Sequence, residues 1–165
     1  MIQKREIILN GDSAIVPLTQ GRVAVIDACD VPLVYDFNWV VLSARNTTYA
    51  QARVKSGKVI TMHRFLMNAP SGMFVDHKDM DGLNNKRDNL RISTRSQNAY
   101  NQGVLARNTS GFKGVCWHKA SGKWMARITS NGNHKYLGLF DAAEKAYDAY
   151  CDAAKIEHGK FARFT

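Results

Sequence analysis

Short apolar segments, separated by Gly, Asp, Asn and Ser, follow one another through the first sixty residues. Their alternating apolar and polar positions are typical of half-buried strands, and their length is too short for helices. We expect five strands here, at residues 13–17, 22–26, 39–43, 48–53 and 58–62. The Ser56-Gly57 pair between the last two segments predicts a hairpin.

The pattern then changes to a mixture of short helices and strands around a polar loop. A short helix is expected at residues 63–67, because Pro70 and Gly72 lie just beyond it. We expect a strand at residues 74–76, a loop at 81–89, a strand at 90–92 and a helix at about 94–101 with Ser93 as its N-cap.

The last third of the chain reads as three strands and one helix. Turn sequences separate three apolar segments at residues 111–119, 123–130 and 134–140. Asp141 and Glu144 have capping-box spacing, apolar residues follow at helical intervals, and Gly159 marks the expected end of the helix. Fewer than sixty residues should be only marginally stable alone.

Composition places this chain of 165 residues, 45% of them hydrophobic, among folded globular proteins. We see no apolar run long enough to span a membrane and no secretory signal, so we expect a cytoplasmic protein. The three cysteines, Cys29, Cys116 and Cys151, form no CxxC pair. We therefore expect reduced thiols and no cysteine zinc site.

Positive charge is concentrated in one segment of a chain whose net charge is +9. Six Lys or Arg and no Asp or Glu occur between Arg107 and Phe140, whereas five acids follow between Asp141 and Glu157. Such a charge suits either nucleic acid or an anionic membrane surface. Because the basic segment has strand character and membrane-surface binding uses amphipathic helices, nucleic acid is favoured.

The loop and helix after residue 74 carry the groups that phosphodiester hydrolysis requires. The reaction needs a nucleophilic oxygen, a base and a cation that neutralises charge on the phosphate. Asp76 and Asn98 could provide hard oxygen ligands for Mg²⁺ or Mn²⁺, and His77 could accept a proton. Asn89 could orient the imidazole. An EF-hand is a weaker interpretation, because its glycine and final glutamate are out of place, so Asp79 and Asp81 are expected to shape the turn.

The run MHRFLMNAPSGMFVDHKDMDGLNNKRDNLRISTRSQNAYNQ resembles the HNH endonucleases of phages and mobile introns. The resemblance implies a ββα-metal nuclease fold in which Asp76 and Asn98 hold a divalent ion, with Asn98 replacing the final histidine of the HNH name. It implies His77 as general base and Asn89 as the residue that positions it. His63 matches an upstream histidine that supports the site.

The run from residue 111 to the C-terminus resembles the AP2 DNA-binding domain, whose three-stranded sheet lies in the major groove. The resemblance implies DNA contacts from Lys113, Trp117, Lys119, Lys123, Arg127 and Lys135, several of which could share one face. Trp124 and Tyr136 could pack on the helix instead. Arg45, Arg53 and Lys55 in the N-terminal strands are further candidates for DNA contacts.

Together these patterns predict an α+β protein: a β-rich N-terminal region with an HNH nuclease over residues 1–102, a linker at 103–110, and an AP2-like domain at 111–165. The predicted function is metal-dependent cleavage of a recognised double-stranded DNA site by a homing-type endonuclease, with no membrane or obligate protein partner. One alternative is a DNA-binding regulator with an inactive nuclease scaffold. Another, resting on charge alone, is an RNA-binding protein.

Overall fold

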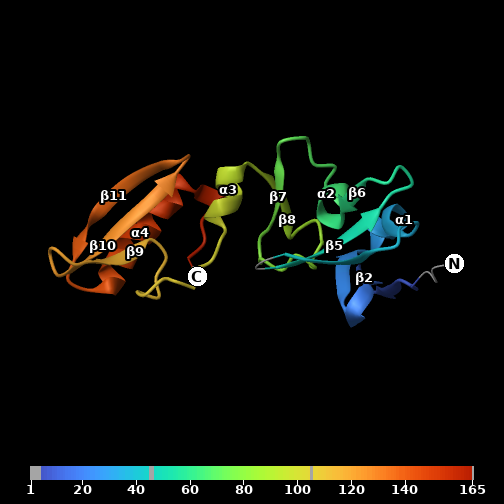
Figure 1. Ribbon diagram of the computed structural model, residues 1–165, viewed down its shortest axis with the longest axis horizontal. Helices are drawn as coiled ribbons and strands as arrows, with labels where there is room; N and C mark the ends of the chain where they lie inside the picture. The colour runs from blue at the N-terminus through green and yellow to red at the C-terminus, as the bar shows by residue number, and fades with distance from the viewer. Residues whose placement is uncertain (1–4, 45–46, 105, 165) are drawn as a thin grey trace. The chain divides into compact units, whose positions relative to one another are not determined.

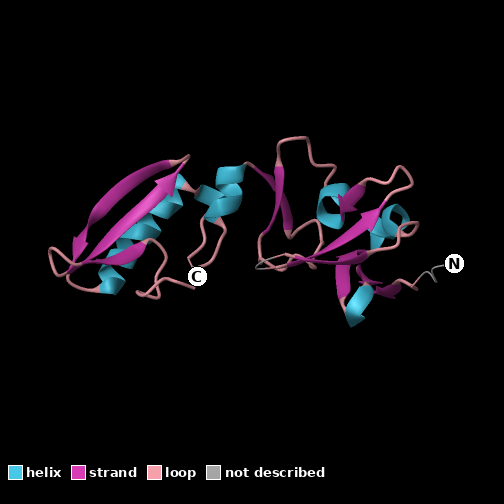
Figure 2. Cartoon of the chain, viewed as in Figure 1, coloured by secondary structure: helices cyan, strands magenta, loops and turns pink. Residues whose placement is uncertain are grey.

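In the computed structural model, which describes residues 5–44, 47–104 and 106–164, the chain divides after Thr94 into two units of mixed α and β structure (Figures 1 and 2). Our sequence-based boundary lay eight residues later. The helix α3 (Arg95–Tyr100) therefore lies in the second unit, Arg95–Thr165. None of the helices among the described residues has the length and apolar character that a membrane crossing requires.

The first unit contains three small antiparallel sheets, and the five strands expected in its N-terminal part are confirmed, two of them at the predicted bounds. We did not predict the short strand β1 or the helical turns η1, η2 and α1. The strands are β1 (Ile8–Asn10), β2 (Ser13–Pro17) and β3 (Val23–Asp27) in one sheet, β4 (Val40–Ser43), β5 (Thr48–Arg53) and β6 (Val59–Thr61) in the second, and β7 (Phe74–His77) and β8 (Leu90–Ser93) in the third. The turns are η1 (Thr19–Gly21), η2 (Ala28–Asp30) and α1 (Val31–Val34).

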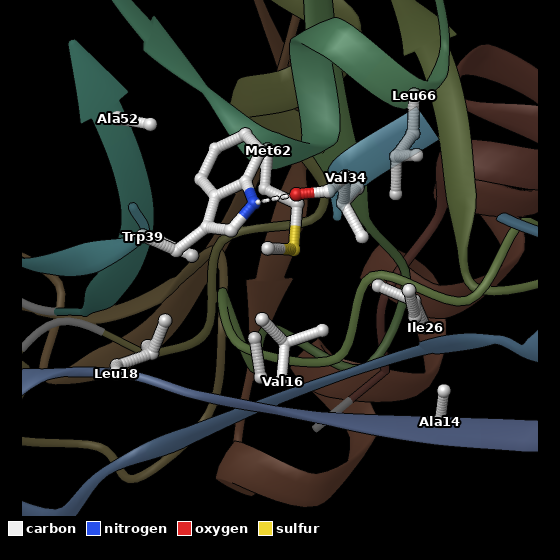
Figure 3. Packing of buried hydrophobic residues seen from close by; sticks show 11 residues of the cluster. Ala14, Val16, Leu18, Ile26, Val34, Trp39, Ala52, Met62 and Leu66 are labelled. Atoms are coloured by element: carbon white, nitrogen blue, oxygen red, sulfur yellow. Dashed lines mark hydrogen bonds between the residues drawn. The ribbon is translucent and has the colours of Figure 1, made fainter. Parts of the chain in front are cut away.

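A single apolar core joins the first two sheets of this unit. Alternate residues of β2 and β3 are buried, which gives the period of two that predicted these strands. Trp39 lies in the centre of the core, and its indole Nε1 donates a hydrogen bond to the carbonyl of Val34 at 3.0 Å (Figure 3). The helix α2 (Met62–Leu66) adds Met62 and Leu66 to this core. It begins one residue before its predicted start.

The second unit places helix α4 (Ala143–Glu157) against a three-stranded antiparallel sheet with the order β11-β10-β9, as expected. Its elements are β9 (Val115–His118), β10 (Lys123–Ser130), β11 (Asn133–Phe140) and the turn η3 (Gly159–Phe161). Ile128 packs with Tyr150 and Ala154 of α4. Gly114 has a φ of +75°, and a β-carbon there would lie 2.2 Å from the Tyr150 ring, so the site requires glycine.

Two predicted helix caps are wrong. Helix α4 has Ala142 at its N-cap and no side-chain cap hydrogen bond, while Asp141 instead forms an ion pair with Lys123 at 3.0 Å. Ser93 is the last residue of β8, and its buried hydroxyl has no hydrogen-bond partner among the described residues. The predicted stop at Gly159 is confirmed, since α4 ends at Glu157 and Gly159 has a φ of +51°.

The loop between β7 and β8 is fixed to the N-terminal sheet by what we call the loop clamp, formed by residues 83–87 with Val25, Asp27 and Asp30. The Val25 amide donates to Leu83 O at 2.9 Å, and the Asn85 amide donates to Val25 O at 2.7 Å. Arg87 Nε and Nη2 then contact the buried carboxylate of Asp30 at distances between 2.7 and 3.1 Å. Bidentate pairing of this kind fixes geometry as well as charge.

We predict that Arg87→Ala lowers the free energy of unfolding of the first unit by about 2 kcal/mol, because it leaves the carboxylate of Asp30 buried and unpaired. Urea unfolding measures the change, followed by the fluorescence of Trp39 in a background in which Trp117 and Trp124 are replaced by Phe. Arg53→Ala is the matched control, because the exposed Arg53 guanidinium donates a hydrogen bond to Gly57 O, four residues away in the same hairpin. Equal losses in the two variants would remove the energetic role of the loop clamp.

Candidate functional site

Strand β7 carries the two central residues of the predicted nuclease site. Asp76 and His77 are neighbours, and only 5% and 6% of their surfaces are exposed. Asp76 lies directly opposite Arg91 of β8, whose Nε and Nη2 contact Asp76 Oδ2 at 2.7 and 2.6 Å. The imidazole of His77 packs edge-on against that of His63, with 5.0 Å between ring centroids.

Burial keeps these two imidazoles neutral. It lowers the pKa of His63 to about 3, and the nearby charges of His77 and Arg64 act in the same direction. Burial also lowers the pKa of His77, against the smaller opposing effects of Asn85 and of Asp79, Asp76 and Asp81. A neutral imidazole has a nitrogen lone pair, so His77 is in the form that a general base requires.

Tyr49 and Asn85 complete the surroundings of the two histidines, and we did not predict either residue. The Tyr49 ring centroid lies 5.0 Å from that of His63 and 5.8 Å from that of His77. Burial, followed by the charge of Asp76, raises the pKa of Tyr49, so its phenol stays protonated. Asn85 is fully buried, and its Oδ1 accepts no hydrogen bond among the described residues. It lies near enough to His77 to oppose the lowering of that histidine's pKa.

Asp79 organises the turn that follows β7, as expected. Its carboxylate accepts hydrogen bonds from the Asp81 amide, from Asn84 Nδ2 and from Asn89 Nδ2 at 2.7 to 2.9 Å. Burial would raise the pKa of Asp79, but these hydrogen bonds outweigh it and the pKa is lowered. The Asp81 carboxylate in turn accepts from the Leu83 amide at 2.9 Å.

The side chain of Asn89 lies within the same turn. Its Oδ1 accepts from the Asp79 amide at 3.2 Å, and its Nδ2 also donates to Asn84 O at 2.8 Å. These contacts give Asn89 a role in holding the loop between β7 and β8. Its role in orienting the His77 imidazole stays a prediction.

Asp76 and Asn98 are suited in chemistry to the metal that the sequence suggests, because a carboxylate and an amide offer hard oxygen atoms. Arg91 Nε and Nη2 both contact Asp76 Oδ2. Asn98 is half-buried on α3, which belongs to the second unit, so its pairing with Asp76 stays a prediction. Within the described residues, no three His, Cys, Asp or Glu side chains lie close enough together to bind a metal. A site with few protein ligands suits Mg²⁺, which usually keeps several waters.

The second unit separates the six residues that we predicted to contact DNA. Lys135 lies opposite Ile128 on the side of the sheet that faces α4, and its Nζ contacts Glu157 of that helix at 3.1 Å. Trp117 pairs with Trp124, which packs into the core cluster on the same side. Lys113 Nζ donates to the carbonyls of Tyr100 and Gln102 at 2.5 and 2.7 Å.

Three of the six, Lys119, Lys123 and Arg127, remain accessible from the other side. We define the open face as the side of the β9-β10-β11 sheet away from α4. Strand register adds residues that we had not assigned to DNA, and it places Tyr136, 60% exposed, opposite Arg127. The open face comprises Cys116, His118, Lys123, Met125, Arg127, Thr129, His134, Tyr136 and Leu139. Arg53 and Lys55 are exposed in the first unit, whereas Arg45 lies outside the described residues.

The residues that pack around the site were harder to predict from the sequence than the residues proposed as the base and the metal ligands. Gly82 illustrates the difficulty: a β-carbon there would lie 2.4 Å from Thr48 O and 2.6 Å from the Tyr49 ring. That constraint joins residues more than thirty positions apart. The sequence contained a signal for Gly82, its position in the Asp-Gly pair, but none for its partner Tyr49.

Comparisons with known proteins agree with both parts of this description. Residues 68–100 match the family model of HNH endonucleases, and residues 110–156 match that of AP2 domains. Protein 3.8 of Escherichia phage T7 is 35% identical over 95 residues, which cover 58% of this chain and 78% of that protein. No solved structure matches.

Two further relatives match different shares of the chain. A protein of Acanthamoeba polyphaga mimivirus, named as the uncharacterized HNH endonuclease L560, is 25% identical over 150 residues, covering 87% of this chain and 74% of that protein. The ethylene-responsive transcription factor ERN3 of Medicago truncatula is 38% identical over 66 residues, covering 39% of this chain and 27% of that protein.

We predict that His63 makes the first unit less stable in mild acid. The folded pKa of about 3 lies below the ordinary 6.5, so the unfolded chain binds a proton first as the pH falls. The stability is complete above pH 6.5 and is lost as the pH falls toward 3. Between pH 7 and pH 5, wild type should lose about 2 kcal/mol more than His63→Phe, measured by urea unfolding. An identical loss in both proteins would show that His63 is protonated in the folded state.

Proposed function

Because the chain belongs to the HNH endonucleases and carries an AP2 domain, we propose that it is a metal-dependent endonuclease that hydrolyses phosphodiester bonds at a recognised double-stranded DNA site. The observation that supports this best is the buried, neutral imidazole of His77 beside the carboxylate of Asp76 on β7. A buried histidine with a shifted pKa next to an acidic residue is typical of catalytic sites.

In the proposed reaction, a nitrogen of His77 accepts a proton from a water molecule as that water attacks the phosphorus. The histidine is held for this task by His63 and Tyr49, whose rings pack against it, and by the loop clamp. Tyr49 stays protonated, so it brings no negative charge to a site that must accept a phosphate. Burial by this packing lowers the pKa of His77, so the imidazole is uncharged before the reaction begins.

Asp76 and Asn98 are the residues that we propose hold a Mg²⁺ or Mn²⁺ ion. When bound, the ion would neutralise the charge that develops on the phosphate and on the leaving oxygen. Arg91 orients the Asp76 carboxylate, since its guanidinium lies 2.6 Å from Oδ2. Asn89 holds the loop that follows His77, and we propose that it positions the base in this way.

We propose that DNA binds to the open face of the second unit. The positive side chains of Lys123 and Arg127 and the exposed ring of Tyr136 lie there, on a sheet narrow enough for the major groove. Lys119, in the turn between β9 and β10, would extend these contacts. Lys135 and Trp117 lie on the α4 side of the sheet, so we assign them a smaller part in binding.

A homing-type role in the host-cell cytoplasm fits the similarity to a phage T7 protein and to a mimivirus protein named as an HNH endonuclease. The two-part organisation supports the same proposal. A nuclease site that makes few base contacts gains local concentration at its target from a tethered DNA-binding module.

His77→Ala should keep wild-type affinity for DNA and lose at least a hundredfold in nicking rate, because a positioned general base contributes about 10²–10⁴-fold. Nicking of supercoiled plasmid in Mg²⁺ or Mn²⁺ measures the rate, and fluorescence anisotropy with a labelled duplex measures affinity. Added imidazole should restore part of the activity of the variant and leave wild type unchanged. Structural damage alone would not be rescued in this way.

Wild-type nicking by His77→Ala would remove this histidine from the mechanism. Tight, specific DNA binding by a wild-type chain that nicks no DNA in either metal would instead favour the regulator with an inactive nuclease scaffold. Preference for single-stranded RNA over duplex DNA would favour the RNA-binding alternative.

Arg127→Ala should weaken duplex binding about tenfold, or about 1.4 kcal/mol, because Arg127 lies on the open face. Lys135→Ala is the matched control: it removes one positive charge from the neighbouring strand on the α4 side. Anisotropy titrations at fixed salt compare the two variants. A larger loss for Lys135→Ala than for Arg127→Ala would place the DNA on the other side of the sheet.

A further inference from the structure

Two neighbouring hollows lie within the second unit, at the edge of the sheet where the segment after α3 packs on it. Their volumes are about 390 and 410 Å³. Ala99, Lys113, Gly114 and Arg127 line both hollows, so the two are parts of one depression. We call this depression the cationic hollow.

Its lining is positively charged and contains no acid. Lys113 and Arg127 line both parts, Arg107 lines the smaller and Arg95 the larger. No Asp or Glu lines either part within the residues that the structure describes. Positive side chains gathered around one hollow repel one another. An anion that entered the hollow would relieve that repulsion and would also gain direct contacts with these side chains.

The walls of the hollow are held in place before any ligand arrives. Lys113 Nζ is fixed by the Tyr100 and Gln102 carbonyls, and the Tyr100 ring stacks on the imidazole of His158 with 3.8 Å between centroids. On the opposite wall, Asn108 Oδ1 accepts hydrogen bonds from the Ser110 and Gly111 amides at 2.9 and 2.8 Å. A preformed wall lowers the entropy lost on binding.

We propose that the cationic hollow binds phosphate groups of the DNA backbone, beside the bases that the open face would contact. This inference rests on the proposed binding of DNA to the second unit. The hollow adjoins the open face, because Arg127 belongs to both, and this continuity of the two surfaces supports the inference. Arginine, lysine and backbone amides are the groups that contact phosphates in protein–DNA complexes, and they orient the protein without reading sequence.

The segment from α3 to residue 109 thereby gains a function beyond that of a linker. Arg107 and Arg95 reach the hollow from this segment and lie outside the sheet that the AP2 resemblance covers. Their contribution should be equal for target and non-target duplexes, since phosphate contacts carry no base information.

Salt dependence of duplex binding tests the proposal, using the full chain in EDTA so that cleavage plays no part. Arg107→Gln should make the log–log salt slope less steep by about 0.9, the value for one lost phosphate contact on duplex DNA. The double variant Arg95→Gln/Arg107→Gln should change it by nearly twice as much. Lys145→Gln removes one charge from an exposed position on α4 and should leave the slope unchanged.

Equal slopes for wild type, Arg107→Gln and Lys145→Gln would overturn the proposal while leaving DNA binding by the open face intact. A wild-type chain that binds no duplex would overturn both. A third arm titrates inorganic phosphate alone. Phosphate binding that Arg107→Gln abolishes, combined with an unchanged duplex slope, would assign the hollow to a small phosphate ligand and overturn its role in DNA binding. Thermal melting of each variant confirms that these exposed substitutions preserve the fold.

Discussion

The nuclease part of this protein depends on the contacts that hold the loop between β7 and β8. That loop is polar, and a free segment of its composition would not keep its neighbours buried. The Arg87–Asp30 pair and the hydrogen bonds between Val25 and residues 83–85 fix it to the N-terminal sheet. Asp79 gathers the turn from within. The N-terminal strands therefore act as the support of the site as well as a separate core.

The contacts that hold this loop also determine the electrostatic surroundings of the site. The fixed loop carries Gly82, which packs closely on Tyr49, and Tyr49 covers the rings of His63 and His77. Burial then lowers the pKa of both histidines, while Arg91 compensates the buried charge of Asp76. A buried histidine and a buried acid are neighbours along one strand, and their surroundings differ, since two aromatic rings pack on His77 whereas a guanidinium contacts Asp76.

Local patterns predicted the strands and helices well, because period-two burial and turn residues are written into short stretches such as β2 and β5. Local patterns also predicted the candidate residues of the HNH motif, because that motif occupies one continuous stretch of the sequence. Long-range contacts were missed: no local signal links Asp30 with Arg87, or Tyr49 with Gly82. We expected several of the residues assigned to DNA to share one face, but the sequence did not show which; Lys135 and Trp117 lie on the α4 side, a distinction that depends on strand register.

Nicking of supercoiled plasmid by the full chain, with and without a divalent ion, tests the central claim most directly. The account predicts nicking in Mg²⁺ or Mn²⁺, none in EDTA, and recovery when the ion is returned. Asp76→Ala should remain inactive at ion concentrations that saturate wild type. Nicking that persists in EDTA, or an Asp76→Ala variant as active as wild type at every ion concentration, would contradict it.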